Sequence, residues 1–188
     1  FAYLTGWRVP SEVLPLTWAQ VDFGAGMVRL EVGTTKNREG RTFPFGALPG
    51  LKAVLERQRA HTSAVERRLG QIVPWVFHRD GQRIGDFHKS WRAACRRAAT
   101  VQHGGVARVV RPDLLERIPH DLRRTAVRRL ERAGVSRSVA MKLTGHKTES
   151  VYRRYAIVAE QDLKEGVAKL AALYGRGTEG AQSALGGA

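Results

Sequence analysis

The sequence predicts a mainly α domain with one small antiparallel β-sheet, an α+β fold. Long stretches repeat apolar residues at intervals of three and four, as residues 120–133 do, and this period is typical of a helix packed on one side. Residues 27–32 alternate apolar and polar side chains, as a half-buried strand does. The turn-forming stretch 37–40 leads into a second strand at 41–45. A length of 188 residues suits one such domain.

The elements of the first half are predicted from their boundaries. Ser11 is a suitable N-cap for a short helix at 11–18, and residues 22–26 form a turn before the first strand. A short apolar piece at 73–77 ends in a turn at 79–81. These breaks divide the first half into short elements around the sheet.

The second half is predicted to be helical apart from a polar connection at 102–119. Pro119 precedes a helix that Gly134 ends, and Gly145 ends the helix that follows. The helices expected after the sheet span residues 48–68, 86–101, 120–133, 136–143 and 159–174.

The charge of the chain indicates a polyanionic partner. There are 32 Lys and Arg against 17 Asp and Glu, which gives a formal net charge of +15. Residues 91–132 alone carry eleven Arg and four acidic residues. Such a field attracts nucleic acids, although an Arg-rich helix face can also be merely solvated. Charge therefore predicts the class of partner and leaves the activity open.

The cysteine count and the hydropathy of the chain indicate the kind of compartment in which the protein works. Cys95 is the single cysteine, so no internal disulfide can form, and a reducing compartment is favoured. No apolar run approaches the roughly 18 residues of a membrane span, and no signal peptide opens the chain. We therefore expect no membrane partner.

Several residues suit a reaction at a phosphodiester. Without a metal ion, such a cleavage needs fixed positive charge on the non-bridging oxygens, an in-line nucleophile and a proton for the leaving alkoxide. Arg8 and Arg123 supply charges that stay protonated. His120 lies one turn before Arg123, at a helix start that itself favours a phosphate. His146 follows a helix end, and Tyr155 comes nine residues later.

Each of these candidates also has an ordinary structural interpretation. Isolated histidines and basic residues at a helix start are more often exposed or packed than catalytic. Tyr152 precedes Tyr155 by one helical turn, so one could be core and the other nucleophile, or both could be core. Lys36, at the hairpin turn, is either a mobile general acid or an exposed turn residue. Residues 123–155 also fit a helix-turn-helix, which predicts a regulator without chemistry.

Taken in order, these segments resemble the motifs of the tyrosine recombinase (phage integrase) family, from Thr5 to about Leu173. Single motifs are weak signals, whereas the ordered set is specific. The resemblance also selects Tyr155 over Tyr152, because Tyr155 has the offset from the histidine that the family shows. The motifs are Thr5-Gly6-Trp7-Arg8 with Glu12, Lys36 on the hairpin, His120-Asp121-Leu122-Arg123, and Gly145-His146 followed nine residues later by Tyr155.

The resemblance implies a role for each catalytic candidate. Tyr155 would attack the scissile phosphate and form a 3′-phosphotyrosine, which keeps the bond energy, so rejoining would need no ATP, metal ion or other cofactor. Arg8 and Arg123 would hold the non-bridging oxygens, and His146 would add a hydrogen bond to the phosphate. His120 would position the site or assist with the proton of the nucleophile.

Two further residues complete the implied site. Lys36 would protonate the 5′-oxygen leaving group, and Glu12 would support the arginine site. One departure from the family concerns this carboxylate. The usual acidic residue lies three positions after the first arginine, whereas Glu12 lies four positions after Arg8, with Pro10 as the extra residue.

The resemblance also predicts the domain organisation. Residues 1–174 are expected to form the catalytic domain, with its first helix cut. Residues 175–188 contain five glycines and are expected to form a flexible tail. The N-terminal helical domain that completes the clamp around DNA in this family is absent from this sequence.

The resulting prediction is a site-specific recombinase or integrase of a phage or other mobile element. It would act on double-stranded DNA as a homo-oligomer, a tetramer, in the bacterial cytoplasm in association with the nucleoid. Three alternatives stay open. They are a topoisomerase that nicks one strand by the same chemistry, a non-catalytic DNA-binding module of the same fold, and a structural RNA-binding protein that uses charge alone.

Overall fold

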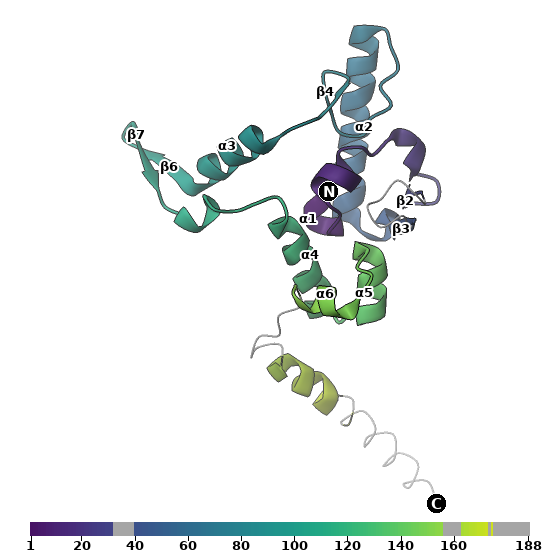
Figure 1. The fold of residues 1–188 in the computed structure, drawn as a ribbon, viewed down its shortest axis with the longest axis vertical. Coiled ribbons are helices and arrows are strands. Elements are labelled where there is room, and N and C mark those ends of the chain that lie inside the picture. The colour runs from purple at the N-terminus through teal and green to yellow at the C-terminus, as the bar shows by residue number, and fades with distance from the viewer. Residues whose placement is uncertain (32–39, 156–162, 173, 175–188) are drawn as a thin grey trace, which may run out of the picture. The chain divides into compact units, whose positions relative to one another are not determined.

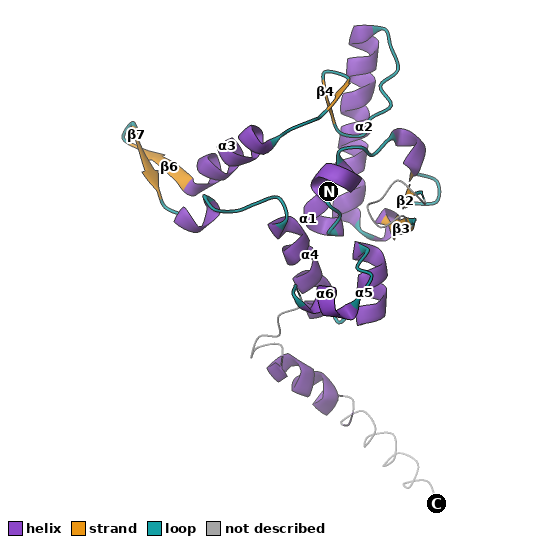
Figure 2. Ribbon diagram, viewed as in Figure 1, coloured by secondary structure: helices purple, strands orange, loops and turns teal. Residues whose placement is uncertain are grey.

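The computed structural model describes residues 1–31, 40–155, 163–172 and 174. The chain divides into two compact units, Phe1–Tyr155 and Ala156–Ala188. The first unit is mostly helical and carries small antiparallel sheets, which confirms the predicted fold class (Figures 1 and 2). No helix of the described residues is both long enough and apolar enough to cross a membrane.

The sheet that was predicted from the alternating pattern is present, with one more strand. It has the order β1-β2-β3, and both pairings are antiparallel, with Val28 opposite Val21 on one side and Phe43 on the other. Pro44 ends the last strand, as expected for a residue without a backbone N–H. The strands are β1 (Val21–Asp22), β2 (Met27–Leu30) and β3 (Arg41–Pro44).

The hydrophobic core lies between this sheet, the N-terminal segment and the long helix α2 (Pro49–Leu69). Leu51 and Leu55 of α2 are fully buried in it, and so is Val28 of β2. The ring of Trp7 is packed edge-on against Phe43 with centroids 6.4 Å apart. Burial of these apolar side chains fixes the N-terminal segment onto the sheet.

The prediction of a short helix at 11–18 is wrong in its bounds. The chain instead forms a five-residue π-helical turn, η1 (Val9–Val13), and a separate 3-10 turn, η2 (Trp18–Gln20). Pro15 explains the break, because proline has no backbone N–H and its ring clashes with the preceding turn. The helix α1 (Ala2–Thr5) precedes η1 and ends at Gly6 in a left-handed conformation.

The later helices confirm the predicted positions within one or two residues. They are α2 (Pro49–Leu69), α3 (His88–Ala99), α4 (Asp121–Arg132) and α5 (Arg137–Thr144). The helix expected at 159–174 is described only at 163–172 and 174, which are helical. The predicted flexible tail, 175–188, lies outside the described residues. Two short elements complete the helical set, η3 (Phe45–Ala47) and α6 (Glu149–Arg153).

The polar connection predicted at 102–119 is wrong, because most of it is structured. It contains a β-hairpin whose strands pair from Thr100–Val109 to His103–Val106, and η4 (Pro112–Leu114) follows. Gly104 and Gly105 both have positive φ and form the tight turn, a conformation that glycine adopts without strain. The hairpins of the second half are β4 (His78–Arg79) with β5 (Gln82–Arg83), and β6 (Thr100–His103) with β7 (Val106–Val109).

The segments that carry the motifs meet where α1 packs on α4, and where α4 and β3 each pack on α5 (Figure 1). Gly6 permits the close approach, because a Cβ there would lie 3.1 Å from Ala126 Cβ of α4 and from Thr144 Cγ2 of α5. Ala126 and Thr144 are themselves fully buried. The packing therefore brings the first motif beside the last two.

Away from these motifs, His78 is a buried histidine held as a neutral ring. Its Nδ1 accepts a hydrogen bond from the Gly81 backbone N–H at 3.2 Å, so Nε2 carries the proton and donates to Thr62 Oγ1 at 3.0 Å. The Thr62 hydroxyl in turn donates to the Gln58 carbonyl at 2.9 Å. Burial, and next the nearby His61 ring, lower the pKa of His78.

This arrangement predicts a pH-dependent part of the stability. Since the unfolded chain binds a proton near the ordinary pKa of 6.5 and native His78 resists protonation, the free energy of unfolding should fall as pH drops below about 6.5. Urea unfolding at about pH 7.5 and about pH 5.5 measures this loss. His78→Gln should lessen the loss, whereas His103→Gln, at an exposed position, should not. Equal losses in both variants would contradict the assignment.

Candidate active site

The first part of the site is the π-helical turn η1, which pairs Arg8 with Glu12. Within it the Val13 backbone N–H donates to the Arg8 carbonyl, five residues earlier, at 3.1 Å. The Glu12 carboxylate is buried and accepts from the Arg8 backbone N–H at 2.7 Å and from Arg8 Nη1 at 2.8 Å. The widened turn therefore accommodates the extra residue, Pro10, and still brings Glu12 to Arg8.

Arg41, the first residue of β3, joins this pair, and sequence reasoning missed it. Its side chain is only 6% exposed, and its Nη2 donates to Glu12 Oε1 at 2.8 Å. The guanidinium also lies over the Trp7 ring, 5.8 Å from the centroid. The only sequence signal was an arginine at the start of a predicted strand, which is ordinary for an exposed residue.

Arg123 enters the site from the first turn of α4 and is 2% exposed. Its Nη1 donates to the carbonyl oxygens of Gly6 and Thr144, both at 2.6 Å. Burial, followed by the charge of Arg8, lowers the pKa of Arg123 to about 10. The guanidinium is therefore still protonated at neutral pH.

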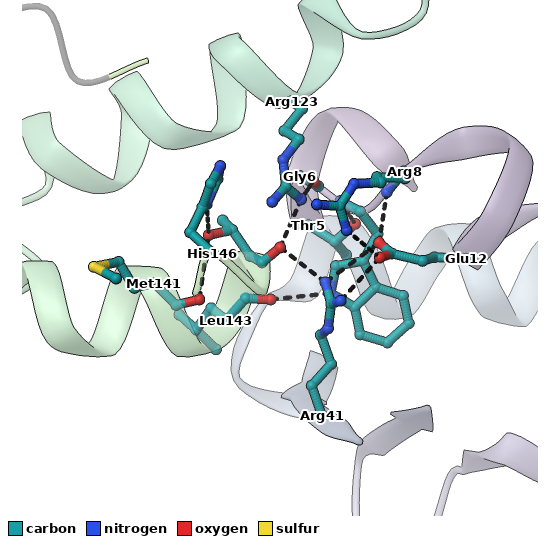
Figure 3. Close-up of polar contacts among 11 residues, drawn as sticks. Thr5, Gly6, Arg8, Glu12, Arg41, Arg123, Met141, Leu143 and His146 are labelled. Carbon is teal, nitrogen blue, oxygen red and sulfur yellow. Dashed lines mark hydrogen bonds and ion pairs between the residues drawn. The ribbon is translucent and has the colours of Figure 1, made fainter. Parts of the chain in front are cut away.

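The Thr144 carbonyl, at the end of α5, links two of these arginines (Figure 3). It accepts from Arg41 Nη1 at 2.8 Å and from Arg123 Nη1 at 2.6 Å. The last carbonyl oxygens of a helix have no partner within the helix and carry its negative dipole end, so guanidinium groups are favourable there. Gly145, left-handed with φ 70°, then turns the chain away.

His146 follows this turn and is held as a neutral imidazole. The Thr144 hydroxyl donates to the Ala140 carbonyl at 2.7 Å, so it accepts the bond from His146 Nδ1–H, also 2.7 Å long. Nε2 is then the nitrogen with the free lone pair. Burial, and after it the charges of Arg123 and other cations, lowers the pKa of His146 to about 3.

His120 and Tyr155 form the remaining pair. The His120 Nε2 and the Tyr155 hydroxyl oxygen are 2.8 Å apart, and the two ring centroids are 5.5 Å apart. The Tyr155 ring also lies 5.2 Å from that of His146. Burial, then the charge of Arg123, lowers the pKa of His120. A neutral imidazole at this distance can accept the hydrogen bond and the proton of a phenol.

The structure separates the two tyrosines. Tyr152 is fully buried and is packed edge-on against His146 at 5.2 Å. Burial raises the pKa of its hydroxyl, which makes it a poor nucleophile. Tyr155 is half-buried and contacts His120. Tyr152 therefore belongs to the core, and Tyr155 is the tyrosine beside the polar cluster.

Of the predicted site residues, the structure joins Arg8, Glu12 and Arg123 through Arg41 and the end of α5. His120, His146 and Tyr155 form one cluster of rings. Figure 3 shows Arg8 and Arg41 meeting at Glu12, and Arg123 beside Gly6 on the side of His146. Lys36 lies outside the described residues.

The arrangement suits an anion. Arg123 Nη2 is a buried donor with no hydrogen-bond partner in the described part of the chain, and the buried His146 Nε2, also without a partner there, can donate to an anion once it carries the ring proton. Leaving a buried polar group unpaired costs about 1–3 kcal/mol, so such atoms are typical of a site awaiting a ligand. The Glu12 carboxylate pairs with two guanidiniums, those of Arg8 and Arg41, whereas the guanidinium of Arg123 bonds only to backbone carbonyls and keeps its charge unpaired among the described residues. The excess positive charge favours a phosphate beside the tyrosine hydroxyl.

A groove of about 1040 Å³ extends the site on the side of His146. Its lining comes from β2, β3, α5 and the residues next to them, and among the described residues of this lining the cations outnumber the carboxylate of Glu31. Such a lining suits a polyanion larger than a single phosphate. The cations of the lining are Arg29, Arg41, Lys142 and Lys147.

Comparison with known proteins gives a family match. A family model described as the phage integrase family matches residues 1–162. No curated protein matches the chain.

Solved structures show the same fold. A crystal structure of XerA recombinase has a TM-score of 0.58 and 19% identity, over 89% of this chain and 55% of that one. The Tn1549 transposon integrase, in complex with a circular intermediate DNA, has a TM-score of 0.63 and 17% identity, over 89% and 56%. XerH recombinase bound to a difH substrate has a TM-score of 0.54 and 17% identity, over 89% and 43%. The chain therefore spans about half the length of these structures.

The turn after α5 gives a test of the packing. Gly145→Ala puts a Cβ into the Arg41 guanidinium and strains a positive φ, whereas Gly70→Ala, at φ 66°, meets only open space. We expect Gly70→Ala to lose about 1 kcal/mol of unfolding free energy and Gly145→Ala about 1–3 kcal/mol more. Urea unfolding measures both. Equal losses would show that the Arg41 side chain moves aside without a cost in unfolding free energy.

The buried ion pair gives a second test. Arg41→Met removes a partner of the buried Glu12, and we expect a loss of about 3–5 kcal/mol in unfolding free energy. Arg29→Met is the control on the neighbouring strand, because the Arg29–Asp22 pair is about half exposed and should matter by less than about 1 kcal/mol. If thermal or urea unfolding finds the two variants equally stable, Arg41 does not hold the site together.

Proposed function

Because the chain belongs to the phage integrase family, we propose that it is a tyrosine-type site-specific recombinase that cleaves and rejoins double-stranded DNA. One observation supports this most directly. The Tyr155 hydroxyl lies 2.8 Å from the neutral His120 ring and next to a buried cluster of arginines. A nucleophile, a base and fixed positive charge are the requirements for attack on a phosphodiester.

In the proposed cleavage step, the Tyr155 oxygen attacks the scissile phosphorus as His120 Nε2 takes the phenolic proton. The new bond is a 3′-phosphotyrosine, and the bond from phosphorus to the 5′-oxygen breaks. Lys36, which comes from the motif alone, gives its proton to that 5′-oxygen. Rejoining is the reverse step, in which a 5′-hydroxyl attacks the phosphorus, the bond from phosphorus to the Tyr155 oxygen breaks, and that oxygen regains its proton. One phosphate ester replaces another in each step, so neither ATP nor a metal ion is needed.

Arg8 and Arg123 are proposed to hold the non-bridging oxygens. Arg123 Nη2 is a buried donor with no partner among the described residues, which an oxygen anion would satisfy. His146 can also donate once its proton is on Nε2. Rotation of the Thr144 hydroxyl toward Nδ1 permits that tautomer, and a phosphate beside the ring favours it. Glu12 and Arg41 keep Arg8 in place.

Double-stranded DNA is the proposed partner, and the recombinase is proposed to act as a homotetramer on it. The Tn1549 integrase and XerH structures were solved with DNA. The second unit contains a helical stretch at 163–172 with an exposed apolar stripe formed by Leu163, Val167 and Leu170. Such a stripe is suited to packing on a neighbouring subunit. We propose residues 1–174 as the catalytic domain and 175–188 as a tail.

Covalent capture tests the nucleophile. A pool of nicked duplexes of random sequence is incubated with the protein, and the products that resist detergent are collected. Wild type should form a covalent complex, and Tyr155→Phe should reduce it by about 10³-fold or more, because the attacking oxygen is lost. Tyr152→Phe, which keeps the buried ring, is the matched control and should retain it.

The other outcomes identify the alternatives. Capture that survives Tyr155→Phe but not Tyr152→Phe would overturn the assignment. DNA binding without a covalent product under any condition would favour a non-catalytic module of this fold. Relaxation of supercoiled plasmid with no sequence preference among the captured duplexes would favour a topoisomerase.

A further inference from the structure

A basic segment lies outside the cluster around Tyr155. Residues 87–112 contain six Lys and Arg and no Asp or Glu. They form α3 and the β6–β7 hairpin, which together we call the arm, residues 88–109. Figure 2 shows the hairpin strands continuing beyond the end of α3. The arm is therefore a continuous element whose charged side chains are all Lys or Arg.

The helix of the arm has one apolar and one basic side. Trp91, Cys95 and Ala98 line a groove of about 530 Å³ that also includes residues of α1 and α4. The Trp91 indole N–H donates to the Arg117 carbonyl at 2.7 Å, which fixes this side. The apolar side of the helix therefore faces this groove, and Trp91 links it to Arg117.

The basic side is exposed, and the described residues place no ion-pair partner on it. Lys89, Arg92 and Arg96 are spaced by three and four residues, so they share a face of α3. None of the three forms an ion pair within the described residues, whereas some exposed arginines elsewhere do, such as Arg68 with Asp80 at 2.7 Å. Their mutual repulsion would be relieved by a polyanion.

The hairpin extends this surface as a narrow ribbon. All its residues from Val101 to Val109 are exposed. Arg108 lies opposite Val101, and Val106 lies opposite His103, so these four side chains share one face. A two-stranded ribbon fits the major groove of B-DNA, where cations contact phosphates or guanine and apolar side chains contact thymine methyl groups.

We propose that the arm binds duplex DNA beside the cleavage site, with the α3 cations on phosphates and the β6–β7 ribbon in a groove. The proposal rests on the proposed function, which supplies the DNA. It assigns the arm a separate contact from the Tyr155 cluster, so that affinity is shared between two surfaces. Loss of the arm should weaken DNA binding and leave the chemistry intact.

The test compares matched charge losses in the full chain. Arg92→Gln with Arg96→Gln removes two arm charges, and Arg57→Gln with Arg67→Gln removes two exposed charges of α2 that have no ion pair among the described residues. Fluorescence anisotropy with a duplex of about 30 base pairs measures affinity between about 50 and 200 mM salt. The arm variant should weaken affinity about 10-fold or more and lower the salt slope by about 1.8, and the control should change neither appreciably.

The ribbon has its own variants. Replacing residues 101–108 with Gly-Gly removes it, and His103→Gln with Arg108→Gln keeps the hairpin while removing its polar contacts. Both should weaken affinity several-fold. Unchanged affinity and slope in the arm variants, or equal effects in the α2 control, would overturn the proposal. Unchanged affinity together with loss of self-association in sedimentation would overturn it in favour of a protein contact.

Covalent capture at saturating DNA separates this proposal from the proposed function. Arm variants should still form the product at the wild-type yield. Tyr155→Phe should bind with wild-type affinity and form none. If Tyr155→Phe still forms product while the arm variants bind weakly, the arm proposal stands and the nucleophile assignment fails.

Discussion

The site depends on one buried contact, in which Arg41 bridges the Glu12 carboxylate and the Thr144 carbonyl. This guanidinium joins the N-terminal turn, the sheet and the end of α5, three segments that are far apart in sequence. Through Glu12 it also fixes Arg8, and at Thr144 it meets Arg123. Burying arginines around a single carboxylate is unfavourable unless something else is satisfied. Here the end of a helix supplies part of the compensation, and an anionic ligand would supply the rest.

The same excess of positive charge governs the two histidines. Burial is the first reason that the pKa of each is lowered, and neighbouring arginines are the second. Both rings are therefore neutral at physiological pH, which leaves His120 able to accept a proton. The same arginines therefore have two effects. They attract a phosphate, and they keep His120 unprotonated so that it can act as a base. Binding a phosphate would partly neutralise that set and make protonation of either ring easier.

Much of this could be predicted from the sequence. Periodicity and glycine or proline boundaries located the four long helices within one or two residues, and the ordered motifs indicated the site residues. What could not be predicted depends on contacts distant in sequence. Arg41 has no motif, because its importance comes from Glu12 and Thr144, which fold next to it. The β6–β7 hairpin was missed because its strands are exposed on both faces and show no apolar alternation. The choice between Tyr152 and Tyr155 came from the family offset, and their burial differs in the same sense.

The π-helical turn at Val9–Val13 has a consequence for recognising related sequences. In an ordinary α-helix, one inserted residue rotates everything after it by about 100°, which would carry the carboxylate away from its arginine. A single wide turn can absorb such an insertion locally: here Glu12, four residues after Arg8, lies 2.8 Å from Arg8 Nη1. The pairing of arginine and acid therefore does not require a gap of three residues. A search that demands a fixed gap between arginine and acid would discard chains whose folded sites are the same.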